Sequence, residues 1–373
     1  MSTRRVVAEI SLKNINENIS TLYNHMPNPK PIIAVIKANG YGHGAIEIAK
    51  SFDDNDKIYG YAVATAEEAL QLRNAKILKP ILILGYVFEE DYKELIVNDI
   101  MFSIFEIESA KRLSKIAKSL NTNAKINIKV DTGMSRIGVR PDSTGLEIVE
   151  NISKIENLDL YGIFTHFARA DELDLQYANN QFNLFSNFIK DLSSKGINFK
   201  ICHCSNSAAI LQYPEAHLDI VRAGIVIYGL WPSNEMMTLD IELKPAMTLK
   251  SHITYIKDIT AGTAISYGGT FVAKKNMKIA TIPVGYADGY PRSLSSKGYV
   301  LINGQKANIL GRVCMDQMMV DVTNIDANPL DEVILLGKSF DEEITAEILG
   351  DMSGRFNYEL VCDFTSRVPR EYV

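Results

Sequence analysis

The residues best suited to chemistry in the first 230 positions fall at or after the ends of predicted strands, except Arg222, which lies within the eighth. They are Lys37, Asp131, Arg136, His166, His203 and Arg222. Each has an ordinary explanation when taken alone: a lysine at a strand end is usually a solvated cap, and His203 looks like a packed core histidine. In a barrel of parallel strands, however, catalytic groups collect at the carboxyl ends of the strands. Their shared position therefore predicts one site.

Lys37 follows the apolar run 31–36 and precedes Asn39-Gly40-Tyr41-Gly42. A lysine that an apolar strand delivers into a site loses hydration, which favours the neutral amine needed for a Schiff base. The glycines allow tight turns and a close approach of the backbone to a ligand. Tyr41 could reach a phosphate.

Two later loops suit a phosphate. Asn206-Ser207 opens the helix after the seventh predicted strand, and Gly224-Ile225 lies late in the eighth. These loops form the usual phosphate site of a (β/α)₈ barrel, and N–H groups at a helix start favour an anion. A Schiff-base lysine with such loops fits pyridoxal phosphate or a sugar-phosphate aldolase. The aldolase is less favoured because it needs no second domain and is expected to place its lysine elsewhere in the barrel.

The elements that must position these residues alternate between short apolar runs and longer amphipathic ones. The expected strands are residues 31–37, 58–64, 81–84, 100–105, 126–130, 160–165, 199–203 and 219–228. Helical patterns lie between them, for example at residues 66–74, 108–120 and 175–192. Near-continuous apolar strands are typical of parallel sheets buried on both faces. The count of eight favours an α/β fold of the (β/α)₈ TIM-barrel type over a doubly wound sheet.

The pattern changes after Trp231-Pro232-Ser233, and we place a domain boundary near residue 237. Strand-like runs at 248–256, 277–284 and 306–309 are separated by glycine-rich turns. Asn303-Gly304 between residues 299–302 and 305–310 predicts a β-hairpin. Residues 1–237 are therefore expected to form the barrel and residues 238–373 a mostly β domain.

Composition narrows the function classes. With 46% hydrophobic and 23% charged residues, the 373-residue sequence is typical of a folded protein. Its net charge of −6 does not indicate the basic surface that a nucleic-acid-binding protein needs. No apolar run is long enough for a transmembrane helix, and residues 1–10 lack the features of a secretory signal. Four cysteines are too few for a disulfide framework. We expect a cytoplasmic protein.

Cys202-His203-Cys204 is the one cluster that suggests a metal. Neighbouring residues on a strand point to opposite faces, and no second ligand pair follows at zinc-like spacing. We expect no metal site.

A run of motifs resembles the alanine racemases, in the order of that family and over nearly the whole chain. The first part contains Ala-Val-Ile-Lys37-Ala-Asn-Gly-Tyr41-Gly-His-Gly, Lys129-Val-Asp-Thr-Gly-Met-Ser-Arg136, Thr165-His166-Phe, Asn206-Ser207-Ala and Arg222-Ala-Gly-Ile-Val-Ile-Tyr228. The second contains Ser266-Tyr267-Gly, Gly285-Tyr286-Ala-Asp-Gly-Tyr-Pro-Arg292, Arg312-Val-Cys314-Met315-Asp316 and Asn357-Tyr358-Glu359.

The resemblance implies a role for each matched residue. Lys37 would hold pyridoxal 5'-phosphate and act as one catalytic base, and Tyr267 of a partner subunit would be the other. Arg222 would donate to the pyridine nitrogen, with His166 as its partner. The phosphate would be bound by Tyr41, Asn206, Ser207, Gly224, Ile225 and Tyr358. Arg136 and the Met315 backbone would hold the substrate carboxylate. The entrance would be lined by Asp171, Tyr286, Arg292, Arg312 and Asp316.

The resemblance also implies that Lys129 is carbamylated, so that an anion orients Arg136; an ordinary strand lysine is the alternative. The implied activity is interconversion of L- and D-alanine, which supplies D-alanine for peptidoglycan, by a homodimer with shared active sites. A racemase of another amino acid, serine or a broad range, is an alternative, as is a non-catalytic pyridoxal-phosphate-binding protein. The latter class resembles the barrel half alone and lacks counterparts of Tyr267 and Cys314-Met315-Asp316. A decarboxylase would be expected to carry an acidic residue where Arg222 stands.

Overall fold

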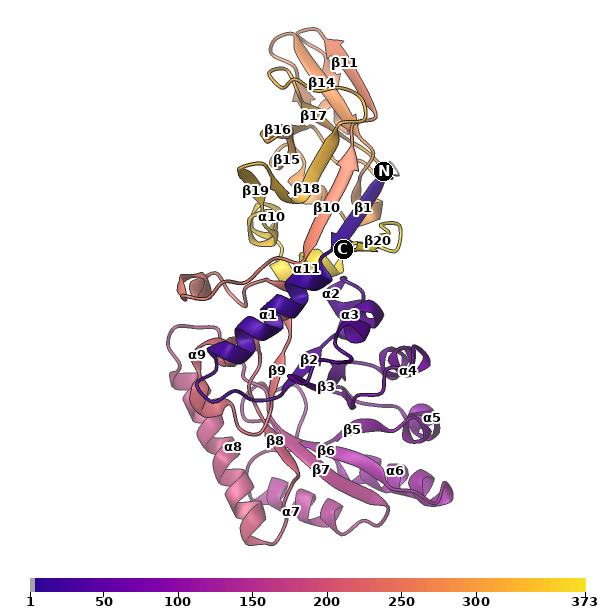
Figure 1. Cartoon of the computed structure of the whole chain (residues 1–373), viewed down its shortest axis with the longest axis vertical. Coiled ribbons are helices and arrows are strands. Elements are labelled where there is room, and N and C mark those ends of the chain that lie inside the picture. Colours follow the sequence, from indigo (N-terminus) through magenta and orange to yellow (C-terminus); the bar gives the residue numbers. More distant parts are fainter. Residues whose placement is uncertain (1–3) are drawn as a thin grey trace. The chain divides into compact units, whose positions relative to one another are not determined.

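The computed structural model describes residues 4–373, which form two compact units (Figure 1). The barrel unit consists of Asn16–Gly40 and Ala45–Leu243. The sheet unit consists of the N-terminal residues up to Ile15, Tyr41–Gly44 and Lys244–Val373. In the described residues no helix is long and apolar enough to cross a membrane.

The barrel unit is built on eight parallel strands in the order β8-β7-β6-β5-β4-β3-β2-β9. Their bounds are β2 Ile32–Val35, β3 Ile58–Val63, β4 Ile81–Ile83, β5 Ile100–Ile104, β6 Ala124–Lys129, β7 Leu158–Phe164, β8 Ile201–His203 and β9 Val221–Ala223. Backbone hydrogen bonds from Asp219 to Cys202 (3.2 Å) and from Arg222 to Ser205 (3.1 Å) link the two end strands. The predicted α/β barrel is confirmed.

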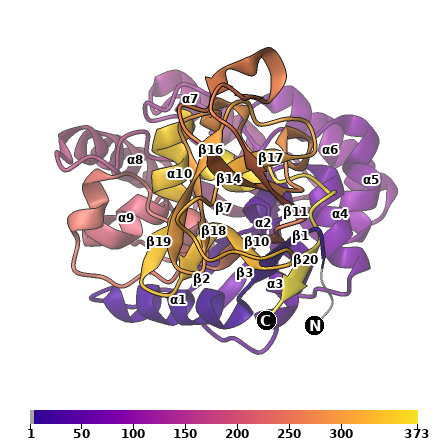
Figure 2. The ribbon, with the colours of Figure 1, turned by 90° about the horizontal axis from the view of Figure 1, so that it is seen from above.

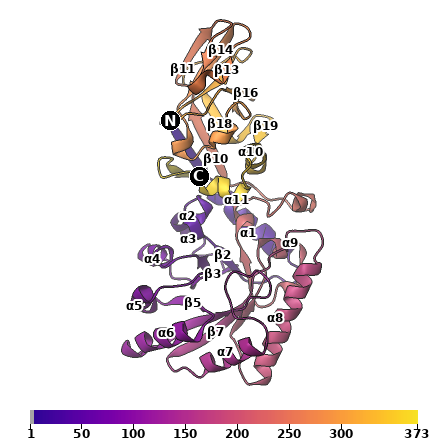
Figure 3. The same cartoon turned by 180° about the vertical axis from the view of Figure 1, so that it is seen from behind.

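Helices cover the outside of this barrel, and Figure 2 shows α4 to α8 around its periphery. The helices are α1 Leu12–His25, α3 Ala45–Ser51, α4 Ala66–Asn74, α5 Tyr92–Val97, α6 Ile107–Ser119, α7 Ser143–Ser153, α8 Gln176–Ser194 and α9 Ser207–Gln212. The long α8 lies along the barrel beside α7 (Figure 3). Its apolar residues Phe185, Phe188 and Leu192 are buried at helical spacing, as expected for a helix with one core-facing side.

The sheet unit contains a mostly antiparallel sheet in the order β11-β14-β17-β16-β15-β18-β10-β1-β20, with β19 on β18. The bounds are β1 Val6–Ile10, β10 Met247–His252, β11 Tyr255–Ile259, β14 Met277–Ile282, β15 Tyr299–Ile302, β16 Gln305–Leu310, β17 Met318–Asp321, β18 Glu332–Ser339, β19 Glu342–Ile344 and β20 Arg370–Tyr372. The small pair β12 (Ala264–Ile265) and β13 (Phe271–Val272), and helices α10 (Ala346–Ser353) and α11 (Asn357–Cys362), complete it. The predicted mostly β second domain is confirmed.

The hairpin predicted at Asn303-Gly304 joins β15 to β16. Both turn residues have positive φ, 48° for Asn303 and 73° for Gly304. Two consecutive left-handed residues match the twist of the flanking strands. This prediction is confirmed.

Strand β1 differs from the expectation that the barrel domain begins at residue 1. It pairs antiparallel with β10 and parallel with β20, so it lies inside the second sheet. Its five residues, Val-Val-Ala-Glu-Ile, carry no signal of their partner, because pairing depends on a segment more than 230 residues away. The boundary near residue 237 stays a prediction; the chain passes from the barrel unit into the sheet unit for the last time between Leu243 and Lys244.

Several predicted strands are shorter than their apolar runs, and the two runs described next differ from the structure in kind. The run 219–228 gives only the three-residue β9, followed by a 3₁₀ helix at Ile225–Tyr228. The run 248–256 is divided between β10 and β11. An apolar run shows that a segment is buried but does not distinguish a strand from a turn of helix.

The barrel interior is packed in register. Lys129, Phe164 and His203 are neighbours across β6, β7 and β8, and the His203 ring stacks on Phe164 with centroids 5.0 Å apart. One layer away, Gly162 of β7 faces Asn127 of β6. A Cβ at Gly162 would clash with Asn127 Oδ1 and come within 3.0 Å of Ile201 Cγ1. Glycine at this position is therefore required by packing.

We predict that Gly162→Ala lowers the free energy of unfolding by about 1–3 kcal/mol through overpacking. Neither polar side-chain atom of Asn127 has a hydrogen-bond partner in residues 4–373, so Asn127→Ala removes the clash without breaking a bond. Gly162→Ala should lower the free energy of unfolding clearly less in the Asn127→Ala background than in the wild type. Urea unfolding of the four proteins measures this coupling, and equal costs in both backgrounds would refute the packing argument.

Candidate active site

Lys37 begins a left-handed turn directly after β2. The following residues have φ values of 51° for Ala38, 52° for Asn39, 64° for Gly40 and 50° for Tyr41. For residues other than glycine, each left-handed conformation costs roughly 1–2 kcal/mol, and a run of them is uncommon. Hydrogen bonds from the Gly40 N–H to Ile36 O (2.8 Å) and from the Ala45 N–H to Asn39 Oδ1 (3.1 Å) support the turn. Strain of this kind concentrates at functional sites.

Arg222 of β9 is almost completely buried, at 3% exposure. Its Nη1 donates to His203 Nδ1 (2.6 Å), and its Nη2 donates to the carbonyls of Thr165 (2.8 Å) and Cys204 (2.9 Å). His166 Nδ1 lies 3.4 Å from Nη2. Within residues 4–373 the Nε–H has no partner, so one donor remains for a ligand.

The protonation states around Arg222 follow from burial and charge. Burial lowers the pKa of Arg222 to about 10, so it stays protonated near neutral pH. Burial, followed by the charge of Arg222, holds the pKa of both His166 and His203 well below the ordinary histidine value. His203 therefore accepts at Nδ1 as a neutral ring.

The sequence interpretation gave the partner role to His166 and treated His203 as a packed histidine. The shorter contact with Arg222 belongs to His203, 2.6 Å against 3.4 Å for His166. His203 also packs as expected, because its ring is stacked on Phe164. A histidine at the end of the strand next to β9 in the barrel was the available signal for this role.

Lys129 ends β6 and is buried beside the same arginine. Its Nζ donates to Val130 O (2.6 Å) and lies 5.6 Å from the Phe164 ring centroid. Burial first, and then the charge of Arg222, lower its pKa to about 7, against a smaller opposing effect of Asp131. A substantial fraction of this amine is neutral near pH 7.

The loops that carry Arg136 and His166 are joined by Gln181 of α8, a residue that the sequence did not single out. Its side chain donates to Thr132 Oγ1 (3.2 Å) and His166 O (3.3 Å) and accepts from the Ala168 N–H (2.9 Å). Gln181 is 1% exposed. A buried polar residue on the core face of a long helix was the signal that could have identified it.

Arg136 lies in the exposed loop after β6 and makes no ion pair with another described residue. The loop is shaped by Asp131, whose Oδ1 accepts the N–H groups of Gly133 (3.1 Å) and Ser135 (2.9 Å). Arg136 is therefore available to a ligand carboxylate.

The predicted phosphate loops lie together in the barrel unit. Ser207 Oγ accepts the Gly224 N–H at 2.9 Å, and the N–H groups of Ser207 and Ile225 have no partner in the described chain. Asn206 caps α9 by accepting the Ala209 N–H (3.0 Å). The Asn206 side chain thus shapes the loop, while unpaired N–H groups and a hydroxyl remain for an anion.

In the sheet unit, two tyrosines predicted to bind the phosphate are neighbours. The rings of Tyr41 and Tyr358 meet edge to face with centroids 6.0 Å apart, and Phe356 stacks on Tyr358 at 4.6 Å. Tyr41 comes from the left-handed turn, and Tyr358 from α11.

Tyr267 follows a strained residue. Ser266 has φ 67° and ψ 179°, a conformation found essentially only for glycine. Its hydroxyl donates to Arg312 O at 2.6 Å, which fixes the turn against the segment after β16. Tyr267 itself is 68% exposed. The fold thus presents this phenol to a ligand or a second chain.

The Cys314-Met315-Asp316 segment is held by the loop at Gly285. The N–H groups of Tyr286 and Ala287 donate to the carbonyls of Cys314 and Met315, both at 3.0 Å. A Cβ at Gly285 would clash with these carbonyls, so the close approach requires glycine. Among the described residues the Met315 N–H has no acceptor, as the predicted carboxylate site requires.

The predicted entrance residues are divided between the two units. Asp171 belongs to the barrel unit, where burial raises the pKa of its carboxyl group. The other four, Tyr286, Arg292, Arg312 and Asp316, are exposed residues of the sheet unit. Asp316 pairs with Arg367 at 2.8 Å.

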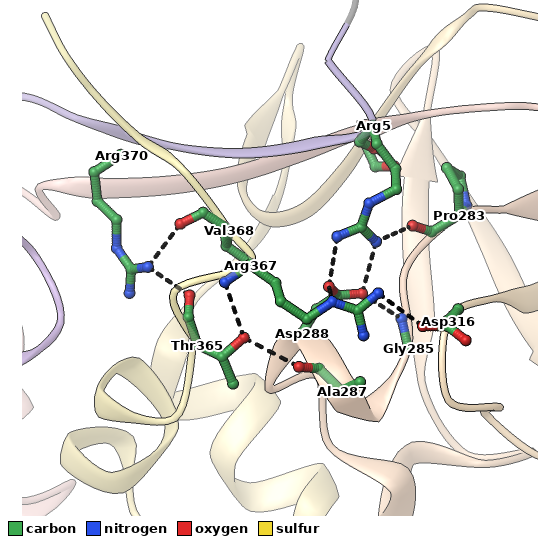
Figure 4. A network of polar contacts seen from close by, with 11 residues as sticks. Arg5, Pro283, Gly285, Ala287, Asp288, Asp316, Thr365, Arg367, Val368 and Arg370 are labelled. Atoms are coloured by element: carbon green, nitrogen blue, oxygen red, sulfur yellow. Dashed lines mark hydrogen bonds and ion pairs between the residues drawn. The ribbon is translucent and has the colours of Figure 1, made fainter.

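Behind the Gly285 loop lies a buried charge network (Figure 4). Asp288, 1% exposed, accepts two hydrogen bonds from Arg5 (2.8 and 2.6 Å) and one from the Gly285 N–H (3.1 Å). Arg367 lies 3.6 Å from Asp288, and Thr365 Oγ1 donates to Ala287 O (3.0 Å). Both ends of the chain therefore fix the loop that supports Met315.

We predict that Asp288→Asn lowers the free energy of unfolding by roughly 1–3 kcal/mol, because it weakens charged hydrogen bonds of a buried group. Asp316→Asn, which affects an exposed pair, is the control and should cost about 0–1 kcal/mol. Similar losses in both variants would contradict the importance of the buried carboxylate.

The pH dependence gives a second check on the same variant. Burial alone would raise the pKa of Asp288, but hydrogen bonds from Arg5 and Gly285 and the nearby arginine charges outweigh it, so the pKa is below its usual value. The resulting stabilisation is present above the unfolded-state pKa, about 4, and is lost as pH falls through the lower folded-state pKa. The stability gap between wild type and Asp288→Asn should shrink in acid.

Comparisons with known proteins agree on one family. The family model described as alanine racemase, N-terminal domain, matches residues 10–232, and that described as alanine racemase, C-terminal domain, matches residues 246–372. The chain is 46% identical over 377 residues to an alanine racemase of Methanococcus maripaludis, covering 100% of both proteins. It is 46% identical over 370 residues to one of Clostridium perfringens, covering 99% of this chain and 95% of that protein.

Solved structures give the same result. An alanine racemase of Clostridium difficile superimposes with a TM-score of 0.95 at 40% identity, covering 100% of this chain and 97% of the other. A structure of the C. difficile enzyme in complex with cycloserine superimposes with a TM-score of 0.93 at 39% identity, covering 100% and 96%.

Proposed function

This chain belongs to the alanine racemase family, and on that premise we propose that it is an isomerase that interconverts L-alanine and D-alanine with bound pyridoxal 5'-phosphate. The observation that carries the proposal is the surroundings of Arg222. A protonated guanidinium is held by neutral acceptors and keeps its Nε–H unpaired, in the same unit as Lys37 and the Ser207–Ile225 loops.

The residues present fit this cofactor. A pyridine nitrogen can accept a hydrogen bond from the Arg222 Nε–H, and the unpaired N–H groups of Ser207 and Ile225 suit phosphate oxygens. Tyr41 and Tyr358 would add hydroxyl donors to the phosphate, with Gly224 allowing close approach and Asn206 shaping the loop. When bound, pyridoxal phosphate supplies an electron sink for the pair left when the Cα–H bond breaks.

Racemisation requires a proton to leave one face of Cα and another to arrive on the opposite face, so two bases are needed. We assign these roles to Lys37 and to Tyr267 of a partner subunit. Arg222 keeps its proton near neutral pH, so the pyridine nitrogen stays an acceptor. By leaving that nitrogen without a proton, Arg222 would keep the electron sink weak, which would favour prompt return of a proton to Cα, and so racemisation, over transamination.

Arg136 and the Met315 N–H would hold the substrate carboxylate, and the entrance would be lined by Asp171, Tyr286, Arg292, Arg312 and Asp316. We also propose that Lys129 is carbamylated. Its partly neutral amine can attack CO₂ and release a proton, which gives a carbamate, and the anion would pair with Arg136.

The alternative of a racemase for serine or a broad range of amino acids is less favoured, because the curated relatives described above are named alanine racemases. A non-catalytic pyridoxal-phosphate protein is also less favoured, because the second family model covers the β domain. Chiral analysis of a panel of L-amino acids with the purified holoenzyme distinguishes an alanine racemase from a racemase of serine or of a broad range.

We further propose that the protein is a cytoplasmic homodimer that supplies D-alanine for peptidoglycan.

We predict that borohydride reduction of the holoenzyme leaves a phosphopyridoxyl group on Lys37, located by peptide mapping. The informative competitor is Lys129, whose pKa of about 7 also makes it a reactive amine. Lys37→Ala should lose both the label and nearly all racemisation. A label on Lys129 or any other lysine in the wild type would overturn the assignment of Lys37.

We predict that two inactive variants complement each other if sites are shared between subunits. In a Lys37→Ala/Tyr267→Ala heterodimer one site carries both lesions and the other carries neither. Random pairing makes half the dimers heterodimers, so roughly a quarter of wild-type activity should return under two-fold symmetry. Co-expression with two tags allows the heterodimer to be purified. If it is no more active than the parents, each site is built within one chain.

A further inference from the structure

Glu68 departs from the local role that its sequence position predicts. Thr65 and Glu68 form the Thr-x-x-Glu pattern of a capping box, in which the glutamate side chain returns to the N–H of the capping threonine. Half of this box is present: Thr65 Oγ1 accepts the Glu68 N–H at 3.3 Å. The Glu68 carboxylate, however, is used elsewhere.

The two carboxylate oxygens of Glu68 bind N–H groups from two different strand ends. Oε2 accepts the Ala64 N–H (2.8 Å), directly after β3, and Oε1 accepts the Ala38 N–H (2.6 Å), directly after Lys37. The hydrogen bond from the Ile36 N–H to Ala62 O (3.0 Å) lies just before this point. Glu68 thus continues the link between β2 and β3 beyond the end of the ladder.

This contact lies where the backbone is most strained. Ala38, with φ 51°, is the first residue of the left-handed turn after Lys37. An alanine adopts this conformation only when its surroundings compensate for the cost. The Ala38 N–H is held by a charged acceptor at short distance, and such bonds are stronger than neutral ones. The bond fixes the peptide plane that joins Lys37 to the turn.

We infer that Glu68 is a positioning residue that sets the direction in which Lys37 leaves the barrel rim. The inference rests on the proposed attachment of pyridoxal phosphate to Lys37. Glu68 acts through the Ala38 peptide, and its contribution is to hold the lysine in the one geometry in which its amine meets the bound cofactor.

Glu68→Gln tests this with little change in size. An amide has one acceptor oxygen, and its NH₂ group cannot accept, so one of the two N–H groups loses its partner. The other keeps only a neutral acceptor, which binds it more weakly than a carboxylate oxygen, so the bond to Ala38 is lost or weakened in either orientation. Glu67→Gln is the matched control: it removes the same charge from the same helix, and Glu67 accepts from neither of these N–H groups. Amide hydrogen exchange at Ala38 is measured in the cofactor-free chain. Affinity for pyridoxal phosphate, labelling of Lys37, and kcat and KM are measured on reconstitution.

We expect faster exchange at Ala38 in Glu68→Gln, at least tenfold weaker cofactor affinity, and a loss in kcat of about 10- to 100-fold with little change in KM. Glu67→Gln should stay within twofold of wild type in every measurement. Unfolding midpoints of the cofactor-free proteins identify a variant that fails to fold, in which case Glu68→Ala, which removes both acceptors and keeps a strong helix former in α4, replaces it.

The inference is overturned if Glu68→Gln matches Glu67→Gln in cofactor affinity and kcat, or if Ala38 exchange is unchanged. Failure of the proposed function has a different signature. In that case the wild type itself carries no label on Lys37, while the exchange at Ala38 still responds to Glu68→Gln.

Discussion

A buried cation with neutral partners organises the barrel unit. Arg222 places its guanidinium at the barrel rim, where it is satisfied by two carbonyl oxygens and an imidazole nitrogen. In the described residues no carboxylate forms an ion pair with it, so its charge acts on the groups around it. That charge, with burial, disfavours protonation of Lys129, His166 and His203. Burial and the charge of one arginine therefore act together to favour the neutral forms of a lysine and two histidines.

The candidate site combines rigid strands with strained turns. Lys37 stands at the beginning of a left-handed run, and Tyr267 follows Ser266, whose backbone conformation is one that glycine normally occupies. At both places a side chain holds the strained backbone: Glu68 binds the Ala38 N–H, and the Ser266 hydroxyl binds Arg312 O. Each proposed base thus lies next to a strained backbone segment that a hydrogen bond holds in one conformation.

Much of the fold could be predicted from the sequence because its signals are local. Eight apolar runs gave the barrel strands, and Asn303-Gly304 gave a hairpin. His166, His203 and Arg222 could be expected near one another because strand ends in a barrel lie at one rim, and both histidines lie beside Arg222; the roles of the candidate residues stay predictions. Contacts between segments far apart in the chain could not be predicted from the sequence. The pairing of β1 with β10 and β20, the contact of His203 with Arg222, and the diversion of Glu68 to Ala38 depend on which segments meet in space.

The position of β1 in the second sheet, between β10 and the edge strand β20, bears on how the chain is made. Ala8 pairs with Leu249 on one side and Arg370 on the other, so β1 has one neighbour from a segment about 240 residues later and another from a segment about 360 residues later. The residues of the barrel unit are translated in between, and domains tend to fold as they emerge. During synthesis β1 therefore has no sheet neighbour until β10 has been made, and its second edge stays open until β20 follows. For this interval a chaperone that shields short apolar segments would protect it from pairing with another nascent chain.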